Sequence, residues 1–105
     1  FKPLVDIPRM AELTGTMVRN ALSAFVNRDL DLARQVGEDD DAVDRLWYAL
    51  LEELMQFMRK VPQLVTQATH LLLVARYLER IADRTTNIGE RLLFVVTGQV
   101  EDLNP

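Results

Sequence analysis

Apolar residues recur at every third or fourth position through most of the chain, which is the period of an amphipathic helix. In the first third of the chain this series comprises Met10, Leu13, Met17, Ala21, Ala24, Phe25, Leu32 and Val36. It predicts a helix from about residue 8 to residue 36, with Pro8 in its first turn and a kink near residues 27–29. Gly37 is the expected C-terminal stop of this helix.

A second series with the same period follows a short acidic run and ends before a proline. It comprises Val43, Leu46, Trp47, Leu50, Leu54, Phe57 and Val61. Acidic residues suit a helix N-terminus because they cap free N–H groups and oppose the macrodipole, so the run from Glu38 to Asp41 marks a helix start. We therefore expect a second helix over residues 39–60, which Pro62 interrupts.

The third series is the longest. It comprises Leu71, Val74, Leu78, Ile81, Thr85, Ile88, Leu92 and Val95. This stripe predicts a helix over residues 63–97 that Gly98 ends, followed by a polar, frayed tail. Three long amphipathic helices with short turns, and no alternating strand pattern, predict an all-α, up-down-up three-helix bundle. We expect residues 1–105 to form one domain.

Oxygen-bearing side chains form another row on the third predicted helix, on a different face and roughly opposite its apolar stripe. The row comprises Glu79, Asp83, Thr86, Asn87 and Glu90. Carboxylates four residues apart repel each other by a few tenths of a kcal/mol, whereas a hard cation between them would reverse that sign. Arg76 and Arg80 precede the first two carboxylates by three residues, so a solvated face with weak ion pairs is the other interpretation that the spacing leaves open.

Asp40 and Asp44 on the second predicted helix repeat the spacing of Glu79 and Asp83. The helix-start explanation covers most of the acidic run without invoking a ligand. The spacing nevertheless makes Asp40 and Asp44 candidates for a second pair that faces a metal ion.

Composition excludes several classes of function. The formal charge of −4 argues against a nucleic-acid partner, and no apolar run approaches the roughly 18–20 residues that cross a bilayer. The sequence contains no cysteine and no signal peptide, so we expect a cytoplasmic protein without membrane insertion. Phe1 is not an initiator methionine, and we expect the chain to have been cut from a longer one.

Catalytic patterns are not recognisable in the sequence. The single histidine, His70, is preceded three residues earlier by Gln67, which does not match the Glu-x-x-His pattern of di-iron bundles. No serine or cysteine stands in a nucleophile–base arrangement, and the glycines are too far apart for a phosphate-binding loop. We therefore expect a protein that is not an enzyme.

The segment from Leu78 to Glu90, followed after a short apolar run by Thr97-Gly98, carries a resemblance to a known family. It resembles the signature of the PhoU family of phosphate-transport accessory regulators, in which Glu/Asp-x-x-x-Asp is followed by asparagine and an acidic residue. Residues 21–29 and 40–46 are similar to the remaining helices of one family repeat. The start of the chain, with Pro3 and Asp6-Ile7-Pro8, is more similar to the second, C-terminal repeat.

The resemblance implies a cytoplasmic regulator built from two tandem three-helix repeats, of which this chain contains one. It implies a metal-binding acidic surface that holds divalent or trivalent cations such as iron, zinc, magnesium or manganese. Carried over to this sequence, the metal ligands are Glu79, Asp83, Asn87, Glu90, Asp40 and Asp44. The implied function is negative regulation of the phosphate regulon through contact with a sensor histidine kinase and a phosphate ABC transporter subunit, by a protein that forms dimers or other homo-oligomers.

Two alternatives remain open from the sequence. In a metal-dependent enzyme, the cations would activate water, and a buried acidic cleft would be expected. In a purely structural dimerisation domain, a surplus apolar face would join two copies.

Overall fold

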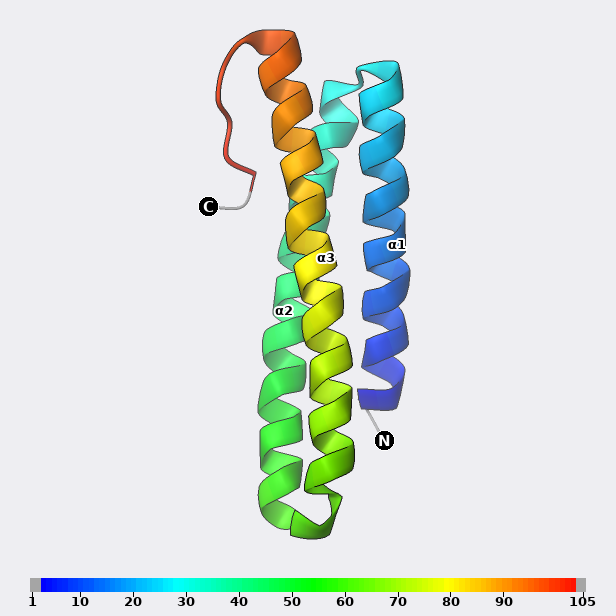
Figure 1. Cartoon of the computed structure of the whole chain (residues 1–105), viewed down its shortest axis with the longest axis vertical. Helices are drawn as coiled ribbons and strands as arrows, with labels where there is room; N and C mark the ends of the chain where they lie inside the picture. Colours follow the sequence, from blue (N-terminus) through cyan, green and yellow to red (C-terminus); the bar gives the residue numbers. More distant parts are fainter. Residues whose placement is uncertain (1–2, 104–105) are drawn as a thin grey trace.

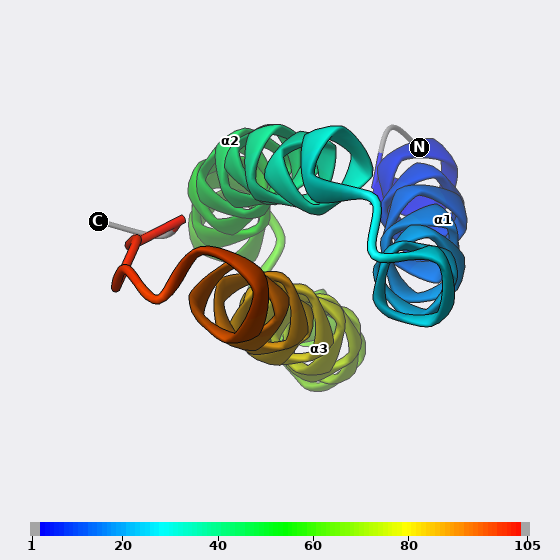
Figure 2. The ribbon, with the colours of Figure 1, turned by 90° about the horizontal axis from the view of Figure 1, so that it is seen from above.

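The computed structural model describes residues 3–103, apart from the side chain of Leu4, and consists of three long helices joined by short turns (Figure 1). The elements in chain order are α1 (Pro3–Asn27), α2 (Leu30–Lys60), the 3-10 turn η1 (Pro62–Leu64) and α3 (Val65–Thr97). The helices run up, down and up, and each packs against the other two, as the view along the bundle shows (Figure 2). The all-α three-helix bundle predicted from the periodicity is confirmed.

The turn between the first two helices lies at Arg28 and Asp29, so the predicted first helix over residues 8–36 is wrong at its end. Arg28 has a left-handed φ of 52°, and the Asp29 carboxylate accepts a hydrogen bond from the Leu32 N–H at 3.1 Å. Such an N-cap stabilises a helix start by about 1 kcal/mol. Residues 27–29 therefore form a complete chain reversal where the sequence had suggested a kink.

Gly37 does not end a helix; it is buried inside α2. A Cβ atom at this position would lie 3.1 Å from the Leu103 Cβ, which is closer than side chains tolerate. The glycine thus has a role in side-chain packing, and its position in the sequence alone could not distinguish that role from a helix stop.

The start of α1 also differs from the expectation, because the helix begins at Pro3 and contains Pro8 in its interior. Pro3 suits a first helical position, where its missing N–H has no intrahelical partner, and Asp6 in the first turn opposes the macrodipole. Pro8 removes only one hydrogen bond, to the carbonyl of residue 4.

The face of α3 that points to the bundle axis is a line of small residues. Ala68, Ala75, Ala82 and Gly89 are spaced by seven and all are buried. A spacing of seven is two helical turns, so these residues share one face and let the helices approach closely. The apolar stripe predicted as the centre of the core lies to one side of this line, and its members Val74, Ile81 and Val95 are 47%, 47% and 62% exposed.

The end of α3 agrees with the expectation. Gly98 adopts a left-handed φ of 75°, and its N–H donates to the Phe94 carbonyl at 2.8 Å. Beyond it the chain folds back along the bundle (Figure 1), and Leu103 packs against a buried cluster that includes Ala33 and Leu92. The tail over residues 99–103 is therefore docked, whereas the sequence had suggested fraying; residues 104–105 lie outside the described part.

Over residues 3–103, no helix combines the length and the apolar character that spanning a membrane requires.

Candidate metal centre

The row of oxygen-bearing side chains on α3 does not point outward. Thr86 is fully buried, the Glu79 side chain is only 14% exposed, and Asp83 and Glu90 are half-buried. The prediction that the row points outward is therefore wrong. The reason is that α3 turns its line of small residues toward the bundle axis, and this line lies between the row and the apolar stripe. The row flanks that line on the side of α2, and Asn87, which is exposed, is left on the outer surface.

The candidate carboxylates of α2 face this row. Electrostatic repulsion at Asp40 comes from Asp44 and Asp41 on its own helix and from Asp83 and Glu79 on α3. Asp44 in turn is affected by Asp83, and Glu79 by Asp44. The two pairs that share the i, i+4 spacing in the sequence are thus neighbours in space. We call Asp40, Asp44, Glu79 and Asp83 the acidic cluster.

Asp40 is the most unusual member of the acidic cluster. It is 0% exposed, and neither carboxylate oxygen has a hydrogen-bond partner. Burial first, and then the surrounding carboxylates, raise the pKa of Asp40 to about 7. An unpaired buried carboxylate costs several kcal/mol, so a positive charge at this point would be strongly stabilising. That charge can be a proton or a metal cation.

The pKa values of two other members, Asp44 and Glu79, are also raised. Burial is the largest cause that raises the pKa of Asp44 and of Glu79. For Glu79 the effect is opposed by Arg76, which forms an ion pair with it and lies 5.8 Å from the centre of the Trp47 ring. The ion pair considered from the sequence is therefore present, but it neutralises one carboxylate of the cluster and leaves Asp40 without a partner.

The donor set of the acidic cluster consists only of carboxylate oxygens, which suit hard cations such as Mg²⁺ and Mn²⁺ and also accept iron. Among residues 3–103, no group of three or more histidine, aspartate or glutamate side chains is arranged so that it could hold a metal ion. A cation that keeps several waters and binds one or two carboxylates fits this open arrangement, and the unpaired oxygens of Asp40 are its natural anchor.

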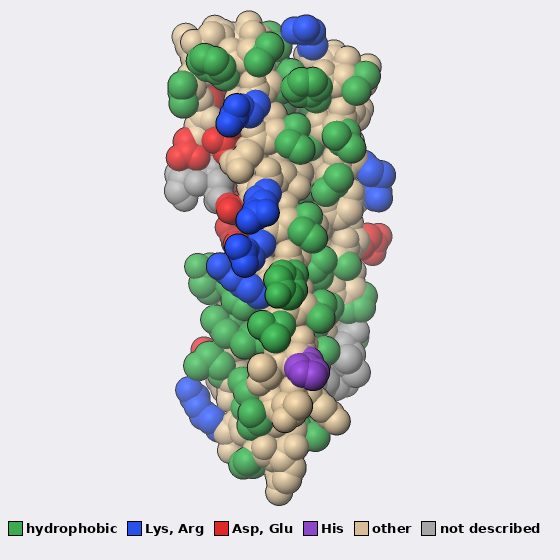
Figure 3. Space-filling view, viewed as in Figure 1, with side chains coloured by type: hydrophobic (Ala, Val, Ile, Leu, Met, Phe, Trp, Pro, Cys, Tyr) green, Lys and Arg blue, Asp and Glu red, His purple; other side chains and the backbone are tan. Residues whose placement is uncertain are grey.

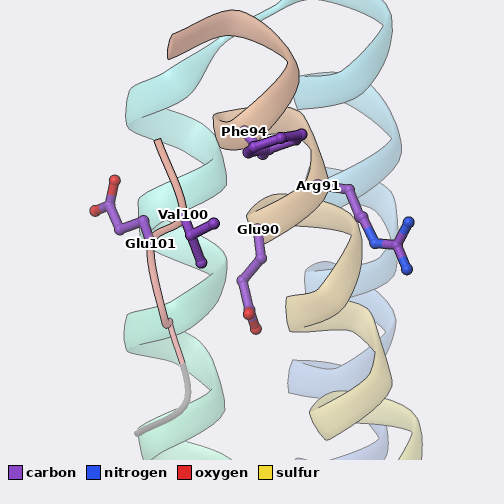
Figure 4. A pocket seen from close by; sticks show the side chains of 5 residues that line it. All are labelled: Glu90, Arg91, Phe94, Val100 and Glu101. Atoms are coloured by element: carbon purple, nitrogen blue, oxygen red, sulfur yellow. The ribbon is translucent and has the colours of Figure 1, made fainter. Parts of the chain in front are cut away.

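Glu90 lies apart from Asp40 and faces the docked tail. It lines a hollow of about 310 Å³ together with Arg91, Phe94, Val100 and Glu101. Glu90 and Val100 point into this hollow, whereas Arg91 points away from it (Figure 4). Burial and then the charge of Asp102 raise the pKa of Glu90. Reasoning from the sequence missed the docking of the tail next to Glu90. The available signals were Gly37 and Gly89 in helix interiors and Leu103 in a polar tail.

The fold and the acidic cluster together define a helical bundle with an interhelical carboxylate face. Residues 7–92 match the family model of the PhoU domain, and the chain belongs to this family. The resemblance noted from residues 78–90 is thereby confirmed.

Three curated relatives illustrate the similarity. A phosphate-specific transport system accessory protein PhoU homolog of Clostridium acetobutylicum is 40% identical over 99 residues, which cover 94% of this chain and 45% of the relative. The homolog 1 of Methanothermobacter thermautotrophicus is 32% identical, over 91% of this chain and 44% of the relative. The homolog of Zymomonas mobilis is 38% identical, over 92% of this chain and 41% of the relative. The chain spans less than half the length of these relatives.

Proposed function

We propose that this chain is a regulatory helical module that controls phosphate uptake and represses the response to phosphate starvation, and that it binds cations at the acidic cluster. Membership of the PhoU domain family supports the phosphate role, as do relatives named phosphate-specific transport system accessory proteins. The observation that carries the cation role is the buried, unpaired carboxylate of Asp40 opposite the carboxylates of α3.

A bound cation supplies the positive charge that the buried carboxylate of Asp40 lacks. Above the pKa of about 7 the Asp40 carboxylate is ionised and has no internal partner. A divalent cation that binds there relieves the repulsion between α2 and α3, which changes both the charge and the rigidity of this face of the bundle.

The proposed partners are a sensor histidine kinase and a subunit of the phosphate ABC transporter, both contacted from the cytoplasm. This part of the proposal rests on the family. The acidic cluster supports it because cation loading would alter the electrostatic surface that a partner meets, and surface charge governs both specificity and association rate. The role requires no chemical conversion.

Calorimetry with Mn²⁺, Mg²⁺, Zn²⁺ and Fe²⁺ tests the cation site, using the chain, its Asp40→Asn variant and a matched Asp41→Asn control. Asp41 is the exposed neighbour of Asp40, so both variants remove one charge from the same turn. We expect Asp40→Asn to lose at least tenfold in affinity and Asp41→Asn to change little. Equal affinity of all three proteins would reject Asp40 as an anchor, and absence of binding would reject the site.

The phosphate role is tested in a bacterium whose own relative has been deleted and which carries a reporter of the phosphate-starvation response. Expression of the protein is expected to lower reporter output in phosphate-rich medium, and Asp40→Asn to restore it. Unchanged reporter output with the wild-type protein, produced at a verified level, would count against this role.

A second candidate function, pairing of two copies, is favoured by apolar side chains exposed over α1 and α3. Leu22 and Phe25 on α1 and Val74, Tyr77 and Ile81 on α3 are each about half exposed or more. Figure 3 shows apolar side chains over this face, beside a ridge of basic ones on α3. Exposed apolar surface of this extent is typical of an interaction face.

Tyr77→Glu and Tyr48→Glu form a matched pair for testing that candidate, because the tyrosines are 61% and 67% exposed and lie on different helices. Sedimentation velocity should show an oligomer that Tyr77→Glu disrupts and Tyr48→Glu leaves intact. A wild-type chain that stays monomeric at high concentration would reject pairing.

A further inference from the structure

The C-terminal segment over residues 99–103, here called the strap, places one leucine in the groove between α2 and α3. A Cβ atom on Gly37 of α2 would lie 3.1 Å from the Leu103 Cβ, and a Cβ atom on Gly89 of α3 would lie 3.1 Å from the Leu103 Cδ1. Both glycines are buried, and Leu103 also packs against a buried cluster that includes Ala33. The two missing side chains therefore form a notch that accepts one leucine.

A charged contact holds the strap two residues before Leu103. The Arg34 guanidinium of α2 donates to both carboxylate oxygens of Glu101, at 3.3 and 3.4 Å. Both side chains are more than 40% exposed, so this ion pair adds little stability and mainly fixes the direction of the strap. The groove therefore recognises two features of an extended segment, which are a carboxylate and a leucine two residues after it.

Few contacts hold the strap apart from these two. Among residues 3–103, no backbone hydrogen bond joins Val100, Glu101 or Leu103 to a helix. Gly98, where the chain leaves α3, has a left-handed φ of 75°, and nothing lies within 4 Å of a Cβ atom built on it. A surface segment with so few contacts opens at a low cost in free energy. The groove is thus accessible to another segment that offers the same two features.

The strap also leaves part of the groove unfilled. Val100 points into the hollow of about 310 Å³ beside α3 (Figure 4), yet 88% of this residue is exposed. Phe94, which lines the same hollow, is 51% exposed. Valine is therefore too small to cover Phe94, and a larger apolar side chain at this position would bury more surface.

We propose that the groove between α2 and α3 is a docking site for an extended segment of a partner protein, and that the strap is the internal ligand that this segment displaces. The segment carries a large apolar side chain, a carboxylate at the next position and a leucine two residues after the carboxylate. This inference goes beyond the proposed function and does not depend on cation binding. A second copy of this chain is the weaker occupant, because its strap brings the same valine and lacks the high effective concentration of a segment on the same chain.

Displacement makes docking competitive. The apparent affinity for the partner segment is reduced by the fraction of molecules in which the strap is seated. A change that only releases the strap must therefore raise the affinity, whereas a change that fills the notch must abolish it.

Two variants of the full 105-residue chain separate these effects. Leu103→Ala releases the strap, and Gly37→Leu fills the notch from α2. Gly15→Leu in α1 is the matched control for Gly37→Leu, since the nearest atom to a Cβ there is an Arg19 side-chain nitrogen at 3.5 Å.

Four capped synthetic peptides are the probes. The first repeats the sequence of residues 98–105, and the second has phenylalanine in place of Val100. The third and fourth are the phenylalanine peptide with alanine in place of Leu103 or with glutamine in place of Glu101.

Binding is measured by NMR titration of the ¹⁵N-labelled protein, which detects millimolar affinities. The chain contains four glycines, and Gly37 and Gly89 line the notch. Gly15 lies on α1 and is the internal control. Gly98 stands at the base of the strap, so its amide signal reports release of the strap from the notch.

We expect the phenylalanine peptide to shift the Gly37 and Gly89 signals of Leu103→Ala and to leave Gly15 unchanged. Half-saturation of the wild-type chain should need at least fivefold more peptide, because the strap competes. In the wild-type chain the peptide should also move the Gly98 signal toward its position in Leu103→Ala.

The other probes and variants define the features that the groove recognises. The peptide with the natural valine should bind about tenfold more weakly than the phenylalanine peptide. Glutamine in place of Glu101 should weaken binding about twofold, and alanine in place of Leu103 should abolish it. Gly37→Leu should bind no peptide, whereas Gly15→Leu should match the wild type.

Absence of shifts at Gly37 and Gly89 with every peptide, in the wild-type chain and in Leu103→Ala, would overturn the docking site. The wild-type titration keeps this test valid if Leu103→Ala fails to fold. Equal affinity of the two proteins would overturn displacement of the strap, and equal affinity for the valine and phenylalanine peptides would overturn the use of the hollow.

Exchange of straps between two copies would give a different result. The Gly37 and Gly89 signals would then shift with protein concentration in the absence of peptide, which would overturn a separate partner as the occupant. None of these outcomes bears on cation binding by the acidic cluster, so this inference and the cation role can fail independently.

Discussion

Replacement of Asp40 by asparagine is expected to stabilise the cation-free protein above neutral pH. Asparagine has the shape of the protonated acid and carries no charge, so it imitates the form that Asp40 adopts below its pKa of about 7. Above that pH the wild-type chain holds an ionised carboxylate that is buried, unpaired and close to other carboxylates. The variant avoids this cost.

The magnitude follows from the raised pKa. A carboxyl group whose pKa is higher in the folded state binds its proton more tightly there, so stability decreases as pH rises from the unfolded value of 3.8 to about 7. The whole difference between the two pKa values corresponds to about 4 kcal/mol of folding stability, and about 3 kcal/mol of this stability is lost between pH 5 and pH 8. The stability advantage of Asp40→Asn should increase by about this amount over that interval.

Urea unfolding followed by circular dichroism at pH 5 and pH 8, with EDTA present, measures the change. Asp41→Asn serves as the control, because it removes a charge at the exposed neighbouring position and should change stability by less than about 0.5 kcal/mol. An Asp40→Asn variant that is no more stable than the wild type at pH 8, relative to pH 5, would refute the buried, unpaired state of this carboxylate. Gain of stability together with loss of cation affinity would mark a functional group retained at a cost in stability.

Three further outcomes are expected. Mn²⁺ affinity should rise about tenfold per pH unit between pH 5 and pH 7 and level off above pH 7, because the cation displaces the Asp40 proton. Calorimetry in buffers of different ionisation enthalpy measures the affinity and the released proton, and an affinity that does not change with pH contradicts the prediction. Asp29→Ala should lower the free energy of unfolding by about 1 kcal/mol because it removes the N-cap of α2. Asp31→Ala in the same turn should lower it by less, and equal effects of the two variants would contradict a stabilising role of the cap. Ala82→Leu should lower the free energy of unfolding in urea by about 1–3 kcal/mol, because the larger side chain overpacks the core at the bundle axis. Leucine at the exposed position of Ala49 should be nearly neutral. If leucine at position 82 is tolerated as well, α3 does not turn this face toward the axis.

Periodicity along the chain was sufficient to predict three helices, their up-down-up order and the end of the third helix at Gly98. These are local properties, because hydrogen bonding within a helix and the left-handed cap involve residues close in sequence. The same local rule identified Asp40, Asp44, Glu79 and Asp83 as candidates through their spacing. Gly37 was misread because a helix-ending glycine and a glycine that accommodates another segment are identical in a single sequence.

The rotation of each helix about its own axis was decided only by the tertiary structure. The third helix carries an apolar stripe and an oxygen row with a line of small residues between them, and hydrophobicity alone favoured the stripe as the centre of the core. Close packing favoured the line of Ala75, Ala82 and Gly89, because small side chains on α3 leave room in the core for large buried side chains of α1 and α2 such as Met17 and Leu50. That rotation turned the oxygen row toward α2, buried Asp40 without a partner, and left the notch that Leu103 fills. The sequence by itself therefore determined which residues carry charge and which form helices, whereas contacts between distant segments determined which charges meet.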